Sequence, residues 1–178
     1  MEGEIVMTRG IDHIGMTVPS IEEATAFFQE AFGAEVSYDV QRPEQEPMAG
    51  DEVEKQLGLP EGTSIIHMRL LRIGDGPTFE LFELGTEPDK EPLRISDIGI
   101  HHFAFYVDNI EQASERFEAA GGSLLSPPHS LDDEEDGPHN AGVYGKTPWG
   151  SLVELIKYPD GVDYPKGSEA PRWTPPKN

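Results

Sequence analysis

Alternation of apolar and polar residues predicts a β-strand over residues 13–18 and another over residues 102–107. A shift of 89 positions carries His13 onto His102. The large apolar side chains on one face of these segments are Ile14, Met16 and Val18, and Phe103, Phe105 and Val107. Each histidine lies on the opposite face, so we expect both to point away from the side that packs in the core.

A helix is predicted after each of these strands. Ser20, with Glu23 three residues later, is typical of a helix start, and Gly33 is typical of its end. Asn109 begins the matching helix, which ends at the glycine pair 121–122. The apolar positions that recur at the same shift are Ile21, Ala24, Phe28 and Ala31, and Ile110, Ala113, Phe117 and Ala120.

Shorter strands are expected after each helix, at residues 35–40, 64–73, 78–84, 123–125, 141–145 and 151–158. Each half of the chain is then a β-α-β-β-β module, over residues 8–85 and 96–158. Neither module could bury its sheet alone. The pattern predicts an α+β fold in which two tandem modules share a core and form a curved mixed sheet around a metal cavity.

Three segments fall outside the repeat. Residues 41–62 are an insertion in the first module, with a short helix expected around residues 52–57. Residues 127–140 are strongly acidic, and either a solvated surface loop or a lid over the cavity fits them. Residues 159–178 form a Pro-rich tail, in which Trp173 is the one large anchor.

Composition excludes several classes of function. The chain of 178 residues has no cysteine, which excludes disulfides, thiolate metal sites and a cysteine nucleophile. Its net charge of -21 is spread over both halves and argues against nucleic-acid binding, which needs a basic face. No apolar run predicts a membrane span or a signal peptide, so the expected location is the cytoplasm.

Two acidic residues interrupt the apolar strands. Glu80 and Glu154 are flanked by apolar residues, and burying an unpaired carboxylate costs several kcal/mol. A metal ion would compensate that cost, and the repeated His13 and His102 would supply further ligands. His101, on the opposite face from His102, is expected to be packed or hydrogen-bonded.

Other polar side chains could contact a substrate. His67 and Arg69 share one face of the strand 64–73, opposite Ile66, Met68 and Leu70. They point into the cavity if those apolar residues pack on the helices, and towards the other side if the strand is shifted by one residue. Tyr106 and Tyr144 could donate hydrogen bonds to a substrate or have only structural roles.

The doubled module, with Asp12-His13-Ile14-Gly15 in one copy and His101-His102-Phe103 in the other, resembles the vicinal oxygen chelate superfamily. That superfamily includes glyoxalase I, methylmalonyl-CoA epimerase, extradiol dioxygenases, and fosfomycin and bleomycin resistance proteins. Residues 147–155 are similar to its Asp-Pro-(Asp)-Gly-x-x-(Ile)-Glu-Leu motif, from which Thr147 and Trp149 depart. The resemblance covers residues 8–158.

The resemblance implies that His13, Glu80, His102 and Glu154 bind a divalent metal with open positions for two neighbouring substrate oxygens. Fe, Mn, Co, Ni and Zn all suit such ligands. The implied activity is proton transfer on a small oxygenated substrate, as in glyoxalases and epimerases. Glu80 is then a fourth ligand or the general base, and His67 is a further catalytic candidate.

Two alternatives remain open. If Glu80 is not a ligand, two histidines and one carboxylate match the Fe(II) site of an extradiol ring-cleaving dioxygenase. A metal-free drug-binding resistance protein is the third possibility, although those members lack the ligand set. Superfamily members often form homodimers, and because this chain supplies both modules we expect each chain to hold a complete set of four ligands.

Overall fold

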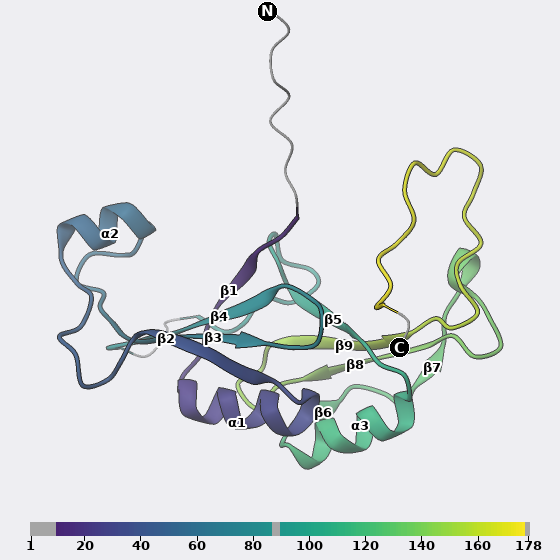
Figure 1. Ribbon diagram of the computed structural model, residues 1–178, viewed down its shortest axis with the longest axis horizontal. Coiled ribbons are helices and arrows are strands. Elements are labelled where there is room, and N and C mark those ends of the chain that lie inside the picture. Colours follow the sequence, from purple (N-terminus) through teal and green to yellow (C-terminus); the bar gives the residue numbers. More distant parts are fainter. Residues whose placement is uncertain (1–9, 87–89, 177–178) are drawn as a thin grey trace, which may run out of the picture.

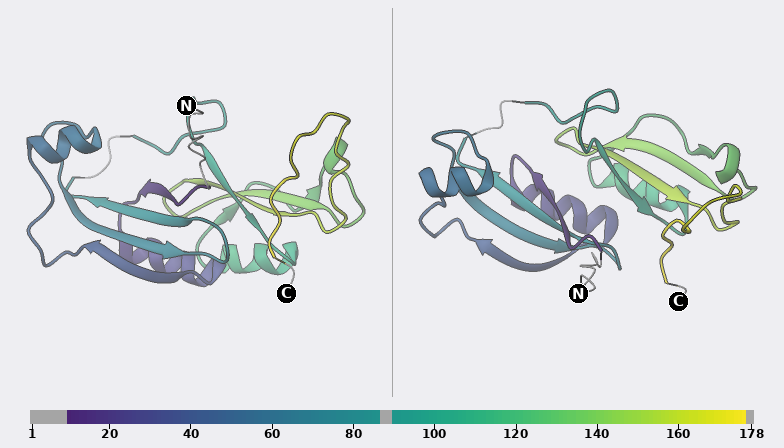
Figure 2. Two further views of the ribbon diagram at one scale, coloured as in Figure 1. Left: turned by 45° about the horizontal axis from the view of Figure 1, so that its top comes forward. Right: turned by 90° about the horizontal axis from the view of Figure 1, so that it is seen from above.

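The computed structural model describes residues 10–86 and 90–176 (Figure 1). Two sheets lie side by side, and the two long helices cover the same side of them (Figure 1, Figure 2). Neither long helix covers the opposite side, which we call the open face of each sheet. None of the helices in the described ranges is long and apolar enough to cross a membrane.

The first module has the predicted order of elements. They are β1 (His13–Thr17), α1 (Ile21–Phe32), β2 (Glu35–Gln41), α2 (Asp51–Leu57), β3 (Ile65–Arg72) and β4 (Thr78–Leu84). The strand order in the sheet is β1-β4-β3-β2, and β1 runs parallel to β4. The short helix expected in the insertion is α2.

The second module repeats this plan. Its elements are β5 (His102–Tyr106), α3 (Ile110–Ala119), β6 (Ser123–Leu124), β7 (His129–Ser130), a 3₁₀ turn η1 (Asp133–Glu135), β8 (Ala141–Lys146) and β9 (Leu152–Lys157). The strand order in the second sheet is β5-β9-β8-β6, so the parallel pair β5 and β9 lies at one edge of this sheet, as β1 and β4 do in the first. The predicted α+β class and the two β-α-β-β-β modules are thus confirmed. β7 and η1 lie in the acidic loop, where no strand or helix was predicted.

Both long helices begin where the sequence predicts. Ser20 Oγ accepts a hydrogen bond from the Glu23 backbone N at 3.3 Å, and Asn109 Oδ1 accepts one from the Gln112 backbone N at 2.9 Å. These bonds satisfy N–H groups that the first helical turn leaves free. Gly33 ends α1 at a φ of 67°, a left-handed conformation that glycine adopts without strain.

One hydrophobic core joins the two modules. Phe32 of α1 stacks on Phe105 of β5 with ring centroids 4.2 Å apart, and Phe27 meets Phe117 of α3 edge to face at 5.5 Å. Trp149, from the turn before β9, also packs edge to face on Phe27 at 5.4 Å. The core therefore depends on both modules, as expected from the inability of either one to bury its own sheet.

Phe117 is fully buried at the centre of this core. Its ring fills the space that a side chain at position 122 or 145 would occupy, and both positions are glycine. A Cβ at Gly145 would lie only 2.7 Å from a ring carbon of Phe117. We expect Phe117→Ala to lower the free energy of unfolding by about 3–5 kcal/mol, because it leaves a cavity that the sheet cannot close. Equilibrium denaturation measures this loss. Leu57→Ala, on exposed α2, is the control and should change stability by less than about 1 kcal/mol.

Candidate metal-binding site

The first pair of predicted ligands lies on the open face of the first sheet. β1 pairs with β4 so that Gly15 lies opposite Glu80, which brings Glu80 beside His13. His13 Nε2 is 3.3 Å from Glu80 Oε2. The other ring nitrogen, Nδ1, is 2.9 Å from Asp12 Oδ2.

The second pair repeats this arrangement. β5 pairs with β9 so that Ala104 lies opposite Glu154, and a shift of 89 positions carries Gly15 onto Ala104. His102 Nε2 is 3.6 Å from Glu154 Oε2. His102 Nδ1 is 2.7 Å from His101 Nδ1, and the two imidazole rings stack with centroids 4.7 Å apart.

Asp12 and His101 occupy the same position of the repeat, and each orients the histidine that follows it. Each holds Nδ1 of the histidine that follows it, which fixes the ring and leaves Nε2 directed at the carboxylate. The prediction that His101 is packed or hydrogen-bonded is confirmed, but its ring stacks on that of His102 instead of lying on the predicted opposite face. Asp12 was missed as an orienting residue, although the same alignment that pairs His13 with His102 also pairs Asp12 with His101.

Each pair has the chemistry of half a metal site. Two donors that bind one ion at about 2.1 Å from adjacent positions lie about 3.0–3.4 Å apart. The two observed N–O separations, 3.3 and 3.6 Å, are close to this range. The Glu80 and Glu154 side chains are only 18% and 12% exposed, so each carboxylate gains from a compensating cation.

The two pairs do not meet. Within residues 10–86 and 90–176, no three or more His, Asp or Glu side chains come close enough together to hold a metal ion. The expectation that one chain brings all four ligands into one set is therefore wrong for this structure. The reason is architectural: the pairs lie on the open faces of two separate sheets instead of facing each other across one cavity.

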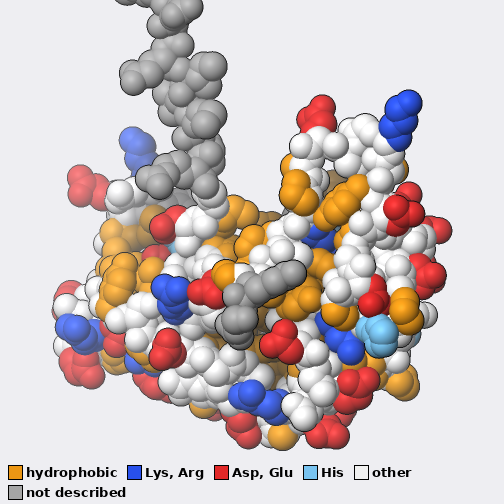
Figure 3. All heavy atoms as spheres, turned by 45° about the vertical axis from the view of Figure 1, so that its right-hand side comes forward, with side chains coloured by type: hydrophobic (Ala, Val, Ile, Leu, Met, Phe, Trp, Pro, Cys, Tyr) orange, Lys and Arg blue, Asp and Glu red, His pale blue; other side chains and the backbone are white. Residues whose placement is uncertain are grey.

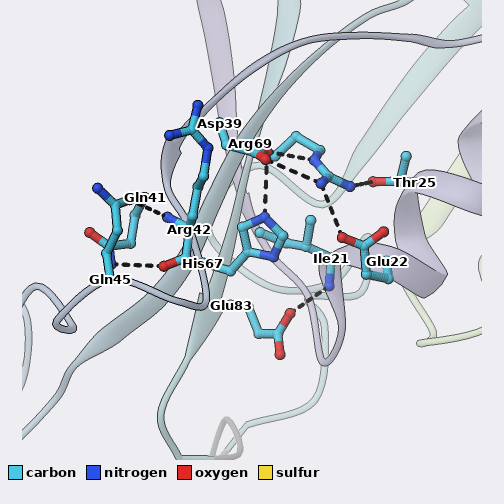
Figure 4. Close-up of polar contacts among 10 residues, drawn as sticks. All are labelled: Ile21, Glu22, Thr25, Asp39, Gln41, Arg42, Gln45, His67, Arg69 and Glu83. Carbon is cyan, nitrogen blue, oxygen red and sulfur yellow. Dashed lines mark hydrogen bonds and ion pairs between the residues drawn. The ribbon is translucent and has the colours of Figure 1, made fainter.

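Of the two orientations left open for His67 and Arg69, the structure has the one that points away from the open face. Arg69 points to the helix side, where Nε donates to Asp39 Oδ1 at 2.6 Å and Nη1 donates to Thr25 Oγ1 of α1 at 3.1 Å (Figure 4). Nη2 donates to Glu22 Oε1, also on α1, at 3.0 Å. His67 is buried, with Nε2 3.4 Å from the same oxygen of Asp39. Neither side chain can reach the open face.

The register of β3 against β4 explains why His67 and Arg69 lie on the helix side. Leu70 lies opposite Glu80, and Arg69 lies opposite Leu81, so the apolar residue of β3 is on the open face and the cation is on the helix side. Met68 and Leu70 are nevertheless buried. Because β3 has buried residues on both faces, the alternation of its sequence does not reveal which face packs on α1.

Tyr144 stands beside the second pair. It lies opposite Glu154 in the pairing of β8 with β9, and its ring meets that of His102 edge to face at 5.4 Å. Burial, and then the negative charge of Glu154, raises the pKa of Tyr144 above its ordinary value. The phenol therefore stays protonated and can donate a hydrogen bond. Tyr106 is on the same face but packs on Tyr158, at 4.9 Å.

Comparison with known proteins places the chain in a family. The family described as the Glyoxalase/Bleomycin resistance protein/Dioxygenase superfamily matches residues 12–137. Together with the doubled module and the repeated His–Glu pairs, this match shows that the chain belongs to that superfamily, which is the vicinal oxygen chelate group. The resemblance inferred from the sequence is confirmed.

One relative by sequence and two solved structures are similar to this chain over most of its length. A protein named 2-epi-5-epi-valiolone epimerase, from Actinomyces sp, is 32% identical over 169 residues, which cover 93% of this chain and 88% of that protein. A glyoxalase family protein from Bacillus cereus superposes with a TM-score of 0.66 at 17% identity, covering 88% of this chain and 97% of its own. The fosfomycin resistance protein FosX from Listeria monocytogenes, in complex with Mn(II) and sulfate, superposes with a TM-score of 0.51 at 20% identity. The superposition covers 85% of this chain and 93% of the FosX chain.

The ion pair between Asp39 and Arg69 makes stability depend on pH. Arg69 donates to Asp39 and holds the pKa of that carboxyl below its ordinary value. The folded state therefore gains stability above the pKa of the unfolded carboxyl, about 3.9, and loses it as the pH falls through the lower folded value. Asp39→Asn should lower the free energy of unfolding at pH 7 by roughly 1–3 kcal/mol, because it removes the negative charge and one of the two acceptor oxygens that pair with a mostly buried guanidinium.

The measurement is equilibrium unfolding between pH 7 and pH 2. Asp39→Asn should lose less stability than the wild type as the pH falls below about 4. The matched control is Asp75→Asn, which removes an exposed pair with Arg72 and should leave stability at pH 7 nearly unchanged. Parallel pH profiles for Asp39→Asn and the wild type would contradict the assignment.

Proposed function

We propose that this protein is a divalent-metal-dependent epimerase that moves a proton at the carbon beside the carbonyl of a small hydroxylated ketone. The observation that carries the proposal is the repeated His–Glu pair, oriented in both modules by the preceding residue. The epimerase relative supports the reaction type, because its name describes inversion of a stereocentre in a ketone. The substrate class is taken from that name and from the superfamily's use of two neighbouring oxygens.

His13, Glu80, His102 and Glu154 would hold the metal. Neutral imidazole and carboxylate suit Mn, Fe, Co, Ni and Zn, and Mn(II) in the FosX complex makes Mn the first ion to test. A bound divalent cation supplies Lewis acidity, which stabilises negative charge on a substrate oxygen when the neighbouring carbon loses its proton.

One of the protein's own groups would remove the proton. Glu80, released from the metal, would accept it from the substrate carbon, because a carboxylate can act as a general base. Inversion requires removal from one side of the carbon and return to the other. Glu154 would stay on the metal, and the proton returned to the other side would come from solvent. The phenol of Tyr144 donates a hydrogen bond to the substrate.

A second copy of the chain is proposed to complete the site. Each pair alone gives a metal only two ligands, and both pairs lie on faces that neither long helix covers (Figure 1). In a twofold homodimer, His13 and Glu80 of one copy meet His102 and Glu154 of the second copy, and symmetry makes two equal sites. Exposed apolar residues near the starts of β1 and β5 fit such an interface; they are Ile11, Ile98 and Ile100, which are 72%, 102% and 73% exposed.

Proton transfer is tested with 2-epi-5-epi-valiolone and the Mn(II)-loaded protein in D₂O. We expect inversion accompanied by solvent deuterium at the inverted carbon, followed by NMR. Glu80→Gln should lower kcat by at least about 100-fold, because the amide cannot accept the proton. Inversion without deuterium, or full activity of Glu80→Gln, would rule out this role.

Glu83→Gln is the matched control for Glu80→Gln. Glu83 lies on the same strand but faces α1, where its Oε2 accepts a hydrogen bond from the Ile21 backbone N at 2.8 Å. This substitution should lower stability slightly and leave kcat within about threefold of the wild type. A loss as large as that of Glu80→Gln would mean that the effect on catalysis is only structural.

Metal dependence is tested by chelation and reconstitution. Dialysis against EDTA should abolish inversion, and one divalent ion per chain should restore it. His102→Ala should weaken metal binding by at least about 100-fold, whereas His129→Ala, at an exposed position of β7, should not. Oxygen uptake with catechols by the Fe(II)-loaded protein, and no inversion with any ion, would favour the dioxygenase alternative instead.

A further inference from the structure

The tail after β9 returns to the open face of the second sheet and fixes one arginine there. The Arg172 guanidinium carbon lies 4.7 Å from the centroid of the Tyr158 ring. The Arg172 backbone N donates to the Tyr164 hydroxyl at 2.7 Å, and the Tyr158 hydroxyl donates to the backbone carbonyl of Trp173. Contacts on both sides of Arg172 therefore hold it in place, and the ring beneath it fixes the plane of its guanidinium.

The acidic loop is fastened to the same tail. Buried Asn140 donates from Nδ2 to the carbonyls of Glu135 and Gly161, each at 2.9 Å, and its Oδ1 accepts from the Asp160 backbone N at 3.1 Å. The Glu135 carboxylate in turn pairs with Arg172. Residues 129–140 and 159–173 thus form one unit, the loop–tail cap. The acidic loop is more than solvated surface, because the tail fixes its conformation.

This cap borders the second His–Glu pair. Glu154 and Ile156 of β9, and Tyr158 directly after the strand, alternate along the chain and share the open face, so Arg172 lies over the same face as Glu154. The surface beside the projecting tail is hollowed, and hydrophobic side chains gather in the hollow (Figure 3).

The chemistry of the Arg172–Glu135 pair suits neutral hydroxyl groups. The guanidinium has five N–H donors and gives one nitrogen to Oε1 of Glu135, and within the described residues the other carboxylate oxygen makes no hydrogen bond. The two side chains remain 35% and 40% exposed, so a ligand can reach the pair from the solvent. Because the opposite charges cancel, the pair presents a fixed donor beside a fixed acceptor. Two neighbouring hydroxyls, each of which donates and accepts, match that arrangement.

We propose that Arg172 and Glu135 form a substrate-specificity site that binds neighbouring hydroxyls of a neutral polyhydroxylated substrate and disfavours its phosphate ester. The position of the substrate beside His102 and Glu154 rests on the proposed function. The binding preference itself needs no turnover. An uncompensated Arg172 would attract a phosphate, and Glu135 removes that attraction.

Binding is tested by calorimetry on the full-length, Mn(II)-loaded protein with myo-inositol and with myo-inositol 1-phosphate. Arg172→Met keeps the packing over Tyr158 but removes the donors, and should weaken myo-inositol binding by at least about tenfold. Arg172→Lys keeps the charge without the planar donor array and should lose most of the same affinity. Glu135→Gln should shift the preference towards the phosphate ester by at least about tenfold.

Arg72→Met is the matched control, because Arg72 forms an exposed pair with Asp75 at the end of β3. It should change neither binding constant. Equal binding of myo-inositol by the wild type and Arg172→Met, or no binding by the wild type, would overturn the specificity site. An unchanged preference in Glu135→Gln would contradict the role of that carboxylate.

Kinetics separates this inference from the proposed function. With 2-epi-5-epi-valiolone, Arg172→Met should raise KM by about tenfold and leave kcat within about threefold, with an unchanged metal content. A fall in kcat with unchanged KM would overturn the binding role. If the wild type binds myo-inositol through Arg172 but does not invert the ketone, the proposed function fails and the specificity site stands.

Discussion

The arrangement of the candidate site depends on one constraint, the parallel pairing of the first and last strands in each module. In the first module this pairing puts Gly15 opposite Glu80, and in the second it puts Ala104 opposite Glu154. A histidine two residues earlier on the first strand then meets the carboxylate on the last. A slip of one residue would turn the histidine and the carboxylate to opposite faces, so the backbone register itself makes the His–Glu pair.

The strands, the helix starts and the two His–Glu pairs could largely be predicted, because the chain contains two copies of one β-α-β-β-β module. His13 and His102, and the caps Ser20 and Asn109, recur at one shift, and the duplication distinguishes them from residues that occur once. The side of β3 that packs on α1 could not be predicted in the same way. Met68 and Leu70 are buried on the open face while Arg69 makes ion pairs on the helix side, so hydrophobicity does not distinguish the two faces.

The placement of the two modules relative to each other could not be predicted from the sequence, for a different reason. Local patterns determine which residues form strands, but they do not determine whether two open faces meet within one chain or between two. The core joins the modules through their helix sides, where Phe32 stacks on Phe105, and this leaves the His–Glu pairs on separate sheets. The proposed homodimer would bring these half-sites together, and the proposed specificity site of the loop–tail cap lies beside one of them.

The central claim is that one metal site takes its ligands from two chains, and subunit complementation tests it most directly. His13→Ala and His102→Ala should each be inactive alone. In a mixed dimer one site loses both histidines and the other retains all four ligands. Unfolding and refolding an equal mixture should therefore restore about a quarter of the wild-type activity per chain. No recovery, with mixed dimers shown to form, would contradict a site shared between two chains.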